Sequence, residues 1–284
     1  RRCPGVCVLV WSECGGVVCG GYVCRALTNT SDAYAWGNEV YGGNATLTGV
    51  AEVTCGKYAC AALKTDDTVV AWGKEAFVGD LTNVDLTGIA AISCGGQACV
   101  GLKKDDTAVV WGRPGNGGSG PSVDLIEVAD ITCGGFACVA LMKNNHAYAW
   151  GHASYGGSSG NKDLTDVAKI HCGKYACVAI TNSGGVVAWG SDTQGGDSTY
   201  NNPTDLTNVV VVDVSCGFDV CAAITNSGGL VAWGKYNDFG LANIPANILA
   251  LTNVVHVSCG KKACVALTDN GDAYAWGLTL GSSG

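Results

Sequence analysis

Short apolar runs alternate with polar turns along the chain, and the same alternation occurs seven times. One copy spans residues 172–190 and reads CGKYACVAITNSGGVVAWG. It holds two cysteines five positions apart, a run of small apolar residues, a polar turn and an apolar run ending in Trp-Gly. Short β-branched runs bounded by Gly, Asn and Ser predict strands, and no segment has sustained helical periodicity. A strand-rich repeat of about 40 residues is typical of propellers and solenoids.

Each repeat predicts one propeller blade. In the second copy we expect strands over residues 50–55, 59–63 and 69–72, with tight turns between them. A looser glycine-containing stretch follows each Trp-Gly. A short fourth, outer strand is then expected at Asp80–Thr82, Asp163–Thr165 and Asp205–Thr207.

Seven such units predict an all-β, seven-bladed β-propeller that forms a single domain over residues 1–284. The repeats occupy residues 17–277, and residues 278–284 form a C-terminal tail. Within the N-terminal segment 1–16, residues 6–11 (VCVLVW) resemble another Trp-ending strand. We expect them to donate a strand to the last blade and close the ring. The alternative is that they are the tail of a further repeat.

Fourteen of the seventeen cysteines occur as one pair in each repeat. The two members of a pair flank a four-residue hairpin turn, where antiparallel neighbours lie close enough for a disulfide. We therefore predict one intrablade disulfide per blade, and hence an oxidising compartment: extracellular, secretory or an organelle lumen. Reduced, buried cysteines acting as apolar fillers and a metal site remain alternatives. The pairs are Cys19/Cys24, Cys55/Cys60, Cys94/Cys99, Cys133/Cys138, Cys172/Cys177, Cys216/Cys221 and Cys259/Cys264.

Three further cysteines, Cys3, Cys7 and Cys14, lie outside the repeated pairs. The simplest count is one more bridge and one odd thiol, which could link to a partner.

Composition narrows the function. The net charge is −8 with no long basic run, which disfavours nucleic-acid binding. No apolar stretch reaches the roughly 18 residues of a membrane span. The histidines are scattered, and no catalytic set, paired carboxylates or phosphate-binding loop stands out, so we expect neither an enzyme nor a bound cofactor or metal.

The motif Val/Ile-x-Cys-Gly-x-x-Ala-Cys-Val-Ala-Leu, followed by Val-Val-Ala-Trp-Gly, resembles the repeat of the regulator of chromosome condensation family. The resemblance covers residues 17–277 and implies a seven-bladed propeller. In length and in its repeated Ala-Trp-Gly the chain looks closest to secreted β-lactamase-inhibitor propellers. The family's usual His is Ala or Val here, and these residues hold no basic run like the tail of its nuclear members. Guanine-nucleotide exchange, which the resemblance also implies, therefore receives little support.

The leading interpretation is a non-enzymatic structural or protein-interaction subunit. Its partner would be a larger protein assembly, including a membrane-associated complex docked from its lumenal or extracellular side; a secreted enzyme inhibitor is the alternative. Aromatic residues on loops are typical interface anchors. The candidates are Tyr58, Phe136 and Tyr175 in hairpin turns and Tyr41, Tyr155, Tyr200, Tyr236 and Phe239 in loops after Trp-Gly. Asn29 and Asn44 begin N-glycosylation sequons.

Overall fold

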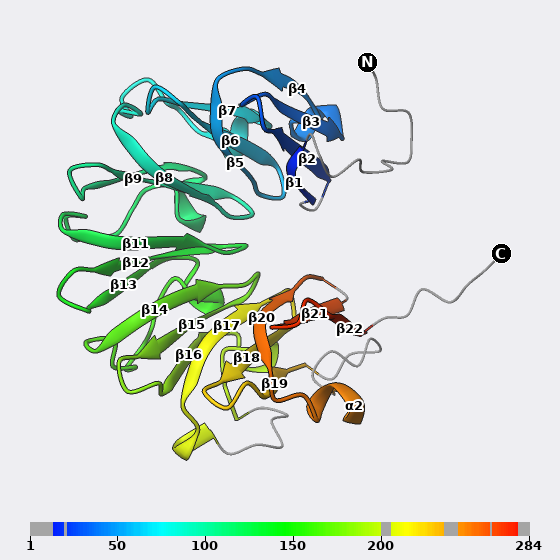
Figure 1. The fold of residues 1–284 in the computed structure, drawn as a ribbon. Coiled ribbons are helices and arrows are strands. Elements are labelled where there is room, and N and C mark those ends of the chain that lie inside the picture. The colour runs from blue at the N-terminus through cyan, green and yellow to red at the C-terminus, as the bar shows by residue number, and fades with distance from the viewer. Residues whose placement is uncertain (1–13, 20–21, 200–205, 236–243, 262, 278–284) are drawn as a thin grey trace.

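A computed structural model of the protein describes residues 14–19, 22–199, 206–235, 244–261 and 263–277, with side chains from residue 22 onward. Within these residues the strands form seven antiparallel sheets in chain order. The sheets follow one another around an arc, from the first (blue) to the last (orange to red) (Figure 1). The predicted all-β architecture of seven repeated blades is confirmed.

The elements occupy equivalent positions in every sheet. The first strands are β1 (Cys14–Cys19), β5 (Val50–Cys55), β8 (Ile89–Cys94), β11 (Val128–Cys133), β14 (Val167–Cys172), β17 (Val211–Cys216) and β20 (Val254–Cys259). The second strands are β2 (Val23–Thr28), β6 (Ala59–Lys64), β9 (Ala98–Lys103), β12 (Ala137–Met142), β15 (Ala176–Thr181), β18 (Val220–Thr225) and β21 (Ala263–Thr268). The third strands are β3 (Ala33–Gly37), β7 (Val69–Gly73), β10 (Ala108–Gly112), β13 (Ala147–Gly151), β16 (Val186–Gly190), β19 (Leu230–Gly234) and β22 (Ala273–Gly277).

Other elements are short. The first sheet has a fourth strand, β4 (Asn44–Leu47), and the described helices are single turns. These turns are η1 (Glu39–Tyr41), α1 (Glu75–Val78), η2 (Pro114–Asn116), η3 (Ala153–Tyr155), η4 (Asp192–Gln194), η5 (Leu206–Asn208) and α2 (Ala246–Leu249).

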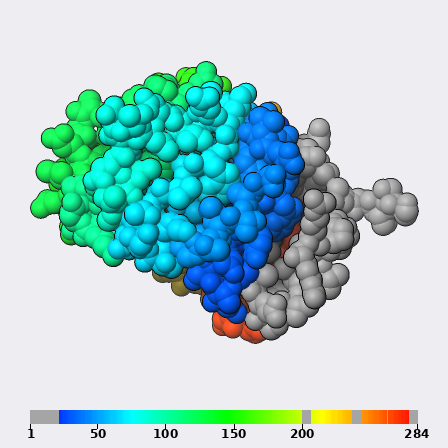
Figure 2. All heavy atoms as spheres, turned by 90° about the horizontal axis from the view of Figure 1, so that it is seen from above, coloured from blue at the N-terminus to red at the C-terminus, as the bar shows by residue number. Residues whose placement is uncertain are grey.

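The central strand of each inner sheet is buried on both faces. On β15, Val178 and Ile180 face the next sheet, where they pack against Cys221 and Ala223 of β18. All four side chains are buried. Because a neighbouring sheet covers each face, this strand carries apolar residues on both faces. In the space-filling view the blue, cyan and green blades pack into one continuous surface (Figure 2).

The repeated tryptophans join neighbouring blades. The indole N–H of Trp150 donates to the carbonyl of Gly117, which follows Trp-Gly of the preceding sheet, over 2.8 Å. Trp72, Trp189 and Trp233 make the same bond to Gly42, Gly156 and Gly195. Trp111 differs: its buried indole N–H has no partner among the described residues. The preceding loop there forms the α-helical turn α1, whereas the other four form 3₁₀ turns.

The expected outer strands at Asp80–Thr82 and Asp163–Thr165 are wrong, because neither segment forms a strand: each is irregular, with a turn at Thr82 and a bend at Thr165. The carboxylate of Asp163 accepts hydrogen bonds from both the backbone N–H and the hydroxyl of Thr165, which competes with strand pairing. The segment still covers its blade, since Leu164 is buried and its carbonyl accepts from the N–H of Ala147. In the third case, Asp205 lies outside the described residues and Leu206–Asn208 form η5.

The last sheet has one covered and one open face. Cys264, Ala266 and Thr268 of β21 are buried against the sixth sheet, whereas Val265 and Leu267 on the other face are 41% and 38% exposed. This open face is where closure of the ring would occur. The strand expected from residues 6–11 lies outside the described residues, so closure by that segment stays a prediction.

Candidate functional site: the hairpin rim

The turns between the first and second strands lie together at one end of the propeller, and we call this end the hairpin rim. Disulfides close these turns in the second to seventh sheets, with Cα atoms 4.0–4.1 Å apart. Cys24, which faces Cys19 across the first hairpin, is also disulfide-bonded. One bridge per blade is therefore confirmed for the described sheets. The six bridges are Cys55–Cys60, Cys94–Cys99, Cys133–Cys138, Cys172–Cys177, Cys216–Cys221 and Cys259–Cys264.

Disulfide bonding and burial as apolar core residues, which the sequence analysis treated as alternatives, occur together in these cysteines. The second cysteine of a bridge is both bonded and buried: Cys99 is 3% exposed and Cys138 is 1% exposed. Cys99 belongs to a core cluster with Trp111, and Cys138 belongs to one with Trp150. These sulfurs therefore pack between blades and do not form part of the outward surface of the rim. Cys3, Cys7 and the Cys14 side chain lie outside the described part.

In the second to sixth hairpins, the glycine that follows the first cysteine lies against its counterpart in the next blade. A Cβ on Gly134 would overlap the carbonyl oxygen of Gly173, and Gly56, Gly95, Gly173 and Gly217 have equivalent contacts. That same Gly173 carbonyl accepts the N–H of Gly135 at 3.0 Å. The main chains of successive blades thus touch at the axis with no room for a side chain. We call this contact the glycine hub.

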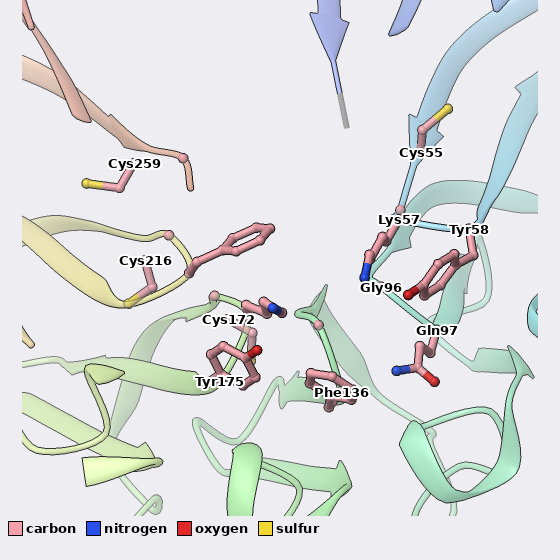
Figure 3. A pocket seen from close by; sticks show the side chains of 17 residues that line it. Cys55, Lys57, Tyr58, Gly96, Gln97, Phe136, Cys172, Tyr175, Cys216 and Cys259 are labelled. Carbon is pink, nitrogen blue, oxygen red and sulfur yellow. The ribbon is translucent and has the colours of Figure 1, made fainter. Parts of the chain in front are cut away.

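The axial pocket opens over the glycine hub, with a volume of about 410 Å³. Hairpin turns of six successive sheets line it, from the second to the seventh. Lys57, Tyr58, Gln97, Phe136 and Tyr175 surround it, and four of the bridging cysteines form part of its wall (Figure 3). Equivalent positions of one hairpin, repeated around the axis, therefore suffice to shape a common cavity.

Two groups of aromatic side chains stand on the hairpin rim. In the first, Tyr41 of η1 lies between the hairpin residues Tyr22 and Tyr58, with ring centroids 5.0 and 5.2 Å away. Phe77 of α1 stacks on Tyr58 at 4.3 Å. The loop after Trp-Gly thus inserts its aromatic ring between the hairpins of its own blade and the next.

The second aromatic group repeats this arrangement further around the ring. Tyr155 of η3 lies 5.1 Å from both Phe136 and Tyr175. His152 stacks on Tyr155 at 4.5 Å. Because hairpin turns and post-Trp loops meet at the same end of a blade, the two sets of residues expected at interfaces form one surface.

Lysines of the hairpin turns lie over these rings. Lys57 Nζ is 4.6 Å from the centre of the Tyr58 ring, and Lys174 Nζ lies between Tyr175 and Phe218 at 4.3 and 4.5 Å. Lys261 also approaches Phe218, at 5.7 Å. A hydrogen bond to the Tyr58 hydroxyl raises the pKa of Lys57, which keeps this ammonium charged.

Polar side chains separate the two aromatic groups. Gln97 is buried, and its Oε1 accepts from Asn116 Nδ2 at 2.8 Å and from Arg113 at 3.1 Å. In the sixth hairpin Asp219 Oδ1 accepts from Gln194 Nε2 at 2.7 Å. Both groups are therefore engaged in hydrogen bonds within the protein.

The structure thus brings five of the eight predicted interaction residues together: Tyr58, Phe136, Tyr175, Tyr41 and Tyr155. Tyr200, Tyr236 and Phe239 lie outside the described residues. The sequon residues Asn29 and Asn44 are exposed, Asn29 in the turn between β2 and β3 and Asn44 at the start of β4. Their glycosylation stays a prediction.

Sequence reasoning missed Lys57, Lys174, Lys261 and Phe218. Their common signal is the hairpin position directly after the glycine that follows the first cysteine, which holds Gly, Lys or Phe in the different repeats. This position varies within an otherwise regular repeat, so it is where the blades differ in the side chain that they place on the rim.

Among the described residues, no cluster of His, Cys, Asp and Glu has the arrangement of a metal site. Within the same residues, no helix has the length and apolar character needed to cross a membrane.

Comparison with known proteins supports the fold. The model of the regulator of chromosome condensation (RCC1) repeat matches residues 254–284. No curated protein sequence matches the chain.

Solved structures similar to this chain are propellers of low sequence identity. Human WBSCR16 is 16% identical, with 90% of this chain and 87% of that chain covered and a TM-score of 0.63. The ectodomain of the Physcomitrella patens receptor kinase CR4 is 19% identical, with 93% and 75% covered and a TM-score of 0.62. Yeast RCC1 (Prp20), solved with Kap60 bound, is 18% identical, with 93% and 70% covered and a TM-score of 0.57.

Proposed function

Because the protein is an RCC1-like β-propeller, we propose that it is a non-catalytic interaction subunit that binds a protein partner through its hairpin rim. Propellers of this type generally serve as binding platforms, and the fold alone does not specify the partner. The observation that carries the proposal is the set of aromatic residues gathered on one rim from two kinds of loop.

The exposure and spacing of these rings support an interface. Tyr22 is 47% exposed, and Tyr41, Tyr58, Phe136 and Tyr175 are half-buried against one another. Half-buried aromatic side chains offer large contact areas at a small cost in side-chain entropy, as interface anchors do. The disulfides hold the hairpins that carry them, so less order has to be gained on binding.

The disulfides also support an oxidising compartment as the site of action. Each described hairpin from the second sheet onward is bridged, and such bridges persist outside the reducing cytosol. The CR4 neighbour is a receptor ectodomain, and the yeast RCC1 neighbour binds Kap60. We infer an assembly reached from an extracellular or lumenal side, including one that is itself membrane-associated.

Site-specific photo-crosslinking tests this proposal. A photoreactive phenylalanine replaces Tyr22 on the hairpin rim or, as a matched control, Tyr34, a 44% exposed residue of β3. In the native extract we expect a saturable covalent adduct of defined mass from position 22 and none from position 34. Equal labelling from both positions, or catalytic turnover by the purified protein, would overturn the proposal.

A further inference from the structure

The axial pocket concentrates positive charge in a protein whose net charge is −8. Lys57 and Lys174 line it, and Lys261 stands beside Phe218 at its edge. No acidic residue is among the described residues that line it. The nearby carboxylate, Asp219, accepts a hydrogen bond from Gln194.

The three lysines are held in place without being neutralised. Within the described part of the chain, none of them forms an ion pair. Aromatic rings support the ammonium groups from the side, through contacts that leave N–H donors available. A partly enclosed site with low-dielectric walls strengthens the field of such charges.

We propose that the axial pocket binds the carboxylates of an acidic peptide segment of the partner, an inference that rests on the proposed interaction role. Lys57 (Figure 3) and Lys174 line the pocket from separate hairpins, so carboxylates on successive peptide residues can meet different ammonium groups. The peptide's flanking residues then contact the aromatic groups at the rim.

The surroundings favour a peptide over a nucleic acid. A long polyanion would extend past the pocket onto a protein of net negative charge, where repulsion opposes binding. A short acidic segment places its charge inside the pocket only. The volume of about 410 Å³ accommodates a few side chains.

Fluorescence anisotropy with labelled hexaglutamate tests the inference on the whole protein. The pocket variant carries Lys57→Gln, Lys174→Gln and Lys261→Gln. The matched control carries Lys64→Gln, Lys104→Gln and Lys143→Gln, which remove the same charge at the opposite end of the blades.

We expect hexaglutamate to bind wild type and control alike, and the pocket variant about tenfold more weakly. Binding should weaken as salt is raised. The single variant Lys174→Gln, which leaves the other two lysines intact, should fall between these values.

Three outcomes would overturn the inference: no binding of hexaglutamate, equal loss in both triple variants, or equally tight binding of hexalysine or oligothymidine. Its failure is separable from failure of the proposed function. Photo-crosslinking from Tyr22 without hexaglutamate binding would leave the rim as an interface and remove only the acidic peptide.

Discussion

The two ends of each blade are held to their neighbours by different interactions. At the hairpin rim, disulfides close the turns and glycine main chains touch between blades. At the other end, which we call the turn rim, the turns between second and third strands carry Asp, Asn, Ser and Gly. There the N–H of Val128 donates to the carbonyl of Asp106 in the preceding blade. Asp106 itself has a positive φ of 64°, so this turn tolerates a side chain in a conformation that favours glycine.

Side chains also connect blades at the turn rim. Lys104 pairs with Asp67 of the preceding blade, and Lys143 pairs with Asp106 in the same way. These groups are exposed, so each pair contributes little to stability. The hairpin rim is therefore fixed by main-chain contact and covalent closure, whereas the turn rim allows substitution.

The largest effect is expected at the glycine hub. Gly134→Ala would place a Cβ against the carbonyl of Gly173, in main chain that has no space to move away. We expect a loss of more than about 3 kcal/mol in the free energy of unfolding, or failure to fold. Gly115→Ala is the matched control, because nothing lies within 4 Å of its added Cβ. Chemical denaturation of both variants measures the difference; equal stability would contradict the hub.

The next effect concerns covalent closure of the hairpins. Replacing Cys172 and Cys177 by Ala removes one bridge over a short loop, which should cost about 2 kcal/mol on the chain-entropy model. Denaturant titration of the oxidised double variant measures the cost. Intact mass without reductant gives an independent check, since each bridge removes about 2 Da. A wild-type mass equal to that of the fully reduced chain would exclude the bridges.

A smaller effect distinguishes two blades within the hairpin rim. Trp150→Phe loses the bond to the Gly117 carbonyl, whereas Trp111→Phe loses no hydrogen bond among the described residues. Both tryptophans are buried, so the loss of packing is similar. We expect Trp150→Phe to cost about 1 kcal/mol more than Trp111→Phe. Thermal unfolding compares them, and the opposite ranking would refute the role assigned to the indole N–H.

The smallest effect is a pH dependence near the turn rim. Hydrogen bonds from Lys103 and Thr87 lower the pKa of Asp85 from 3.8 to about 2, and bonds from Thr68 and Thr107 lower the pKa values of Asp66 and Asp105. A carboxylate with a lowered folded pKa stabilises the protein above 3.8, and this contribution is lost as pH falls toward 2.

Thermal unfolding at pH 7, about 4 and about 2.5 follows this loss. Asp85→Asn should show a smaller decrease between neutral and acidic pH than wild type. Identical acid profiles for wild type and Asp85→Asn would contradict the assignment.

Much of the fold was predictable because the repeat encodes it locally. The alternating runs gave seven blades, and the spacing of Cys55 and Cys60 gave a bridge across a hairpin. The expected fourth strands were wrong because the pattern Asp-x-Thr has an alternative: Asp80 bonds Thr82 and turns the chain. A strand and a turn of this length have the same apolar content, so hydropathy does not separate them.

The candidate site was only half predictable. Aromatic residues in turns indicated an interface, yet nothing in the sequence showed that Tyr41 would lie between hairpins of two blades. Lysines such as Lys174 read as ordinary turn residues, and their convergence at the axis depends on how blades stack. The burial of Cys99 and Cys138 has the same origin, since the neighbouring blade covers these sulfurs. The repeat pattern predicts the strands and turns of one blade, whereas the side chains that meet at the axis depend on the angle between neighbouring blades.

The arrangement of the disulfides determines how the protein would separate into fragments after proteolysis. Each described bridge joins two strands of one sheet, and none of them crosses to a neighbouring sheet. A protease cut in a loop between sheets would therefore leave two pieces held by noncovalent contacts alone. Denaturant would separate such nicked protein into fragments without any reductant, and each fragment would retain its bridges intact.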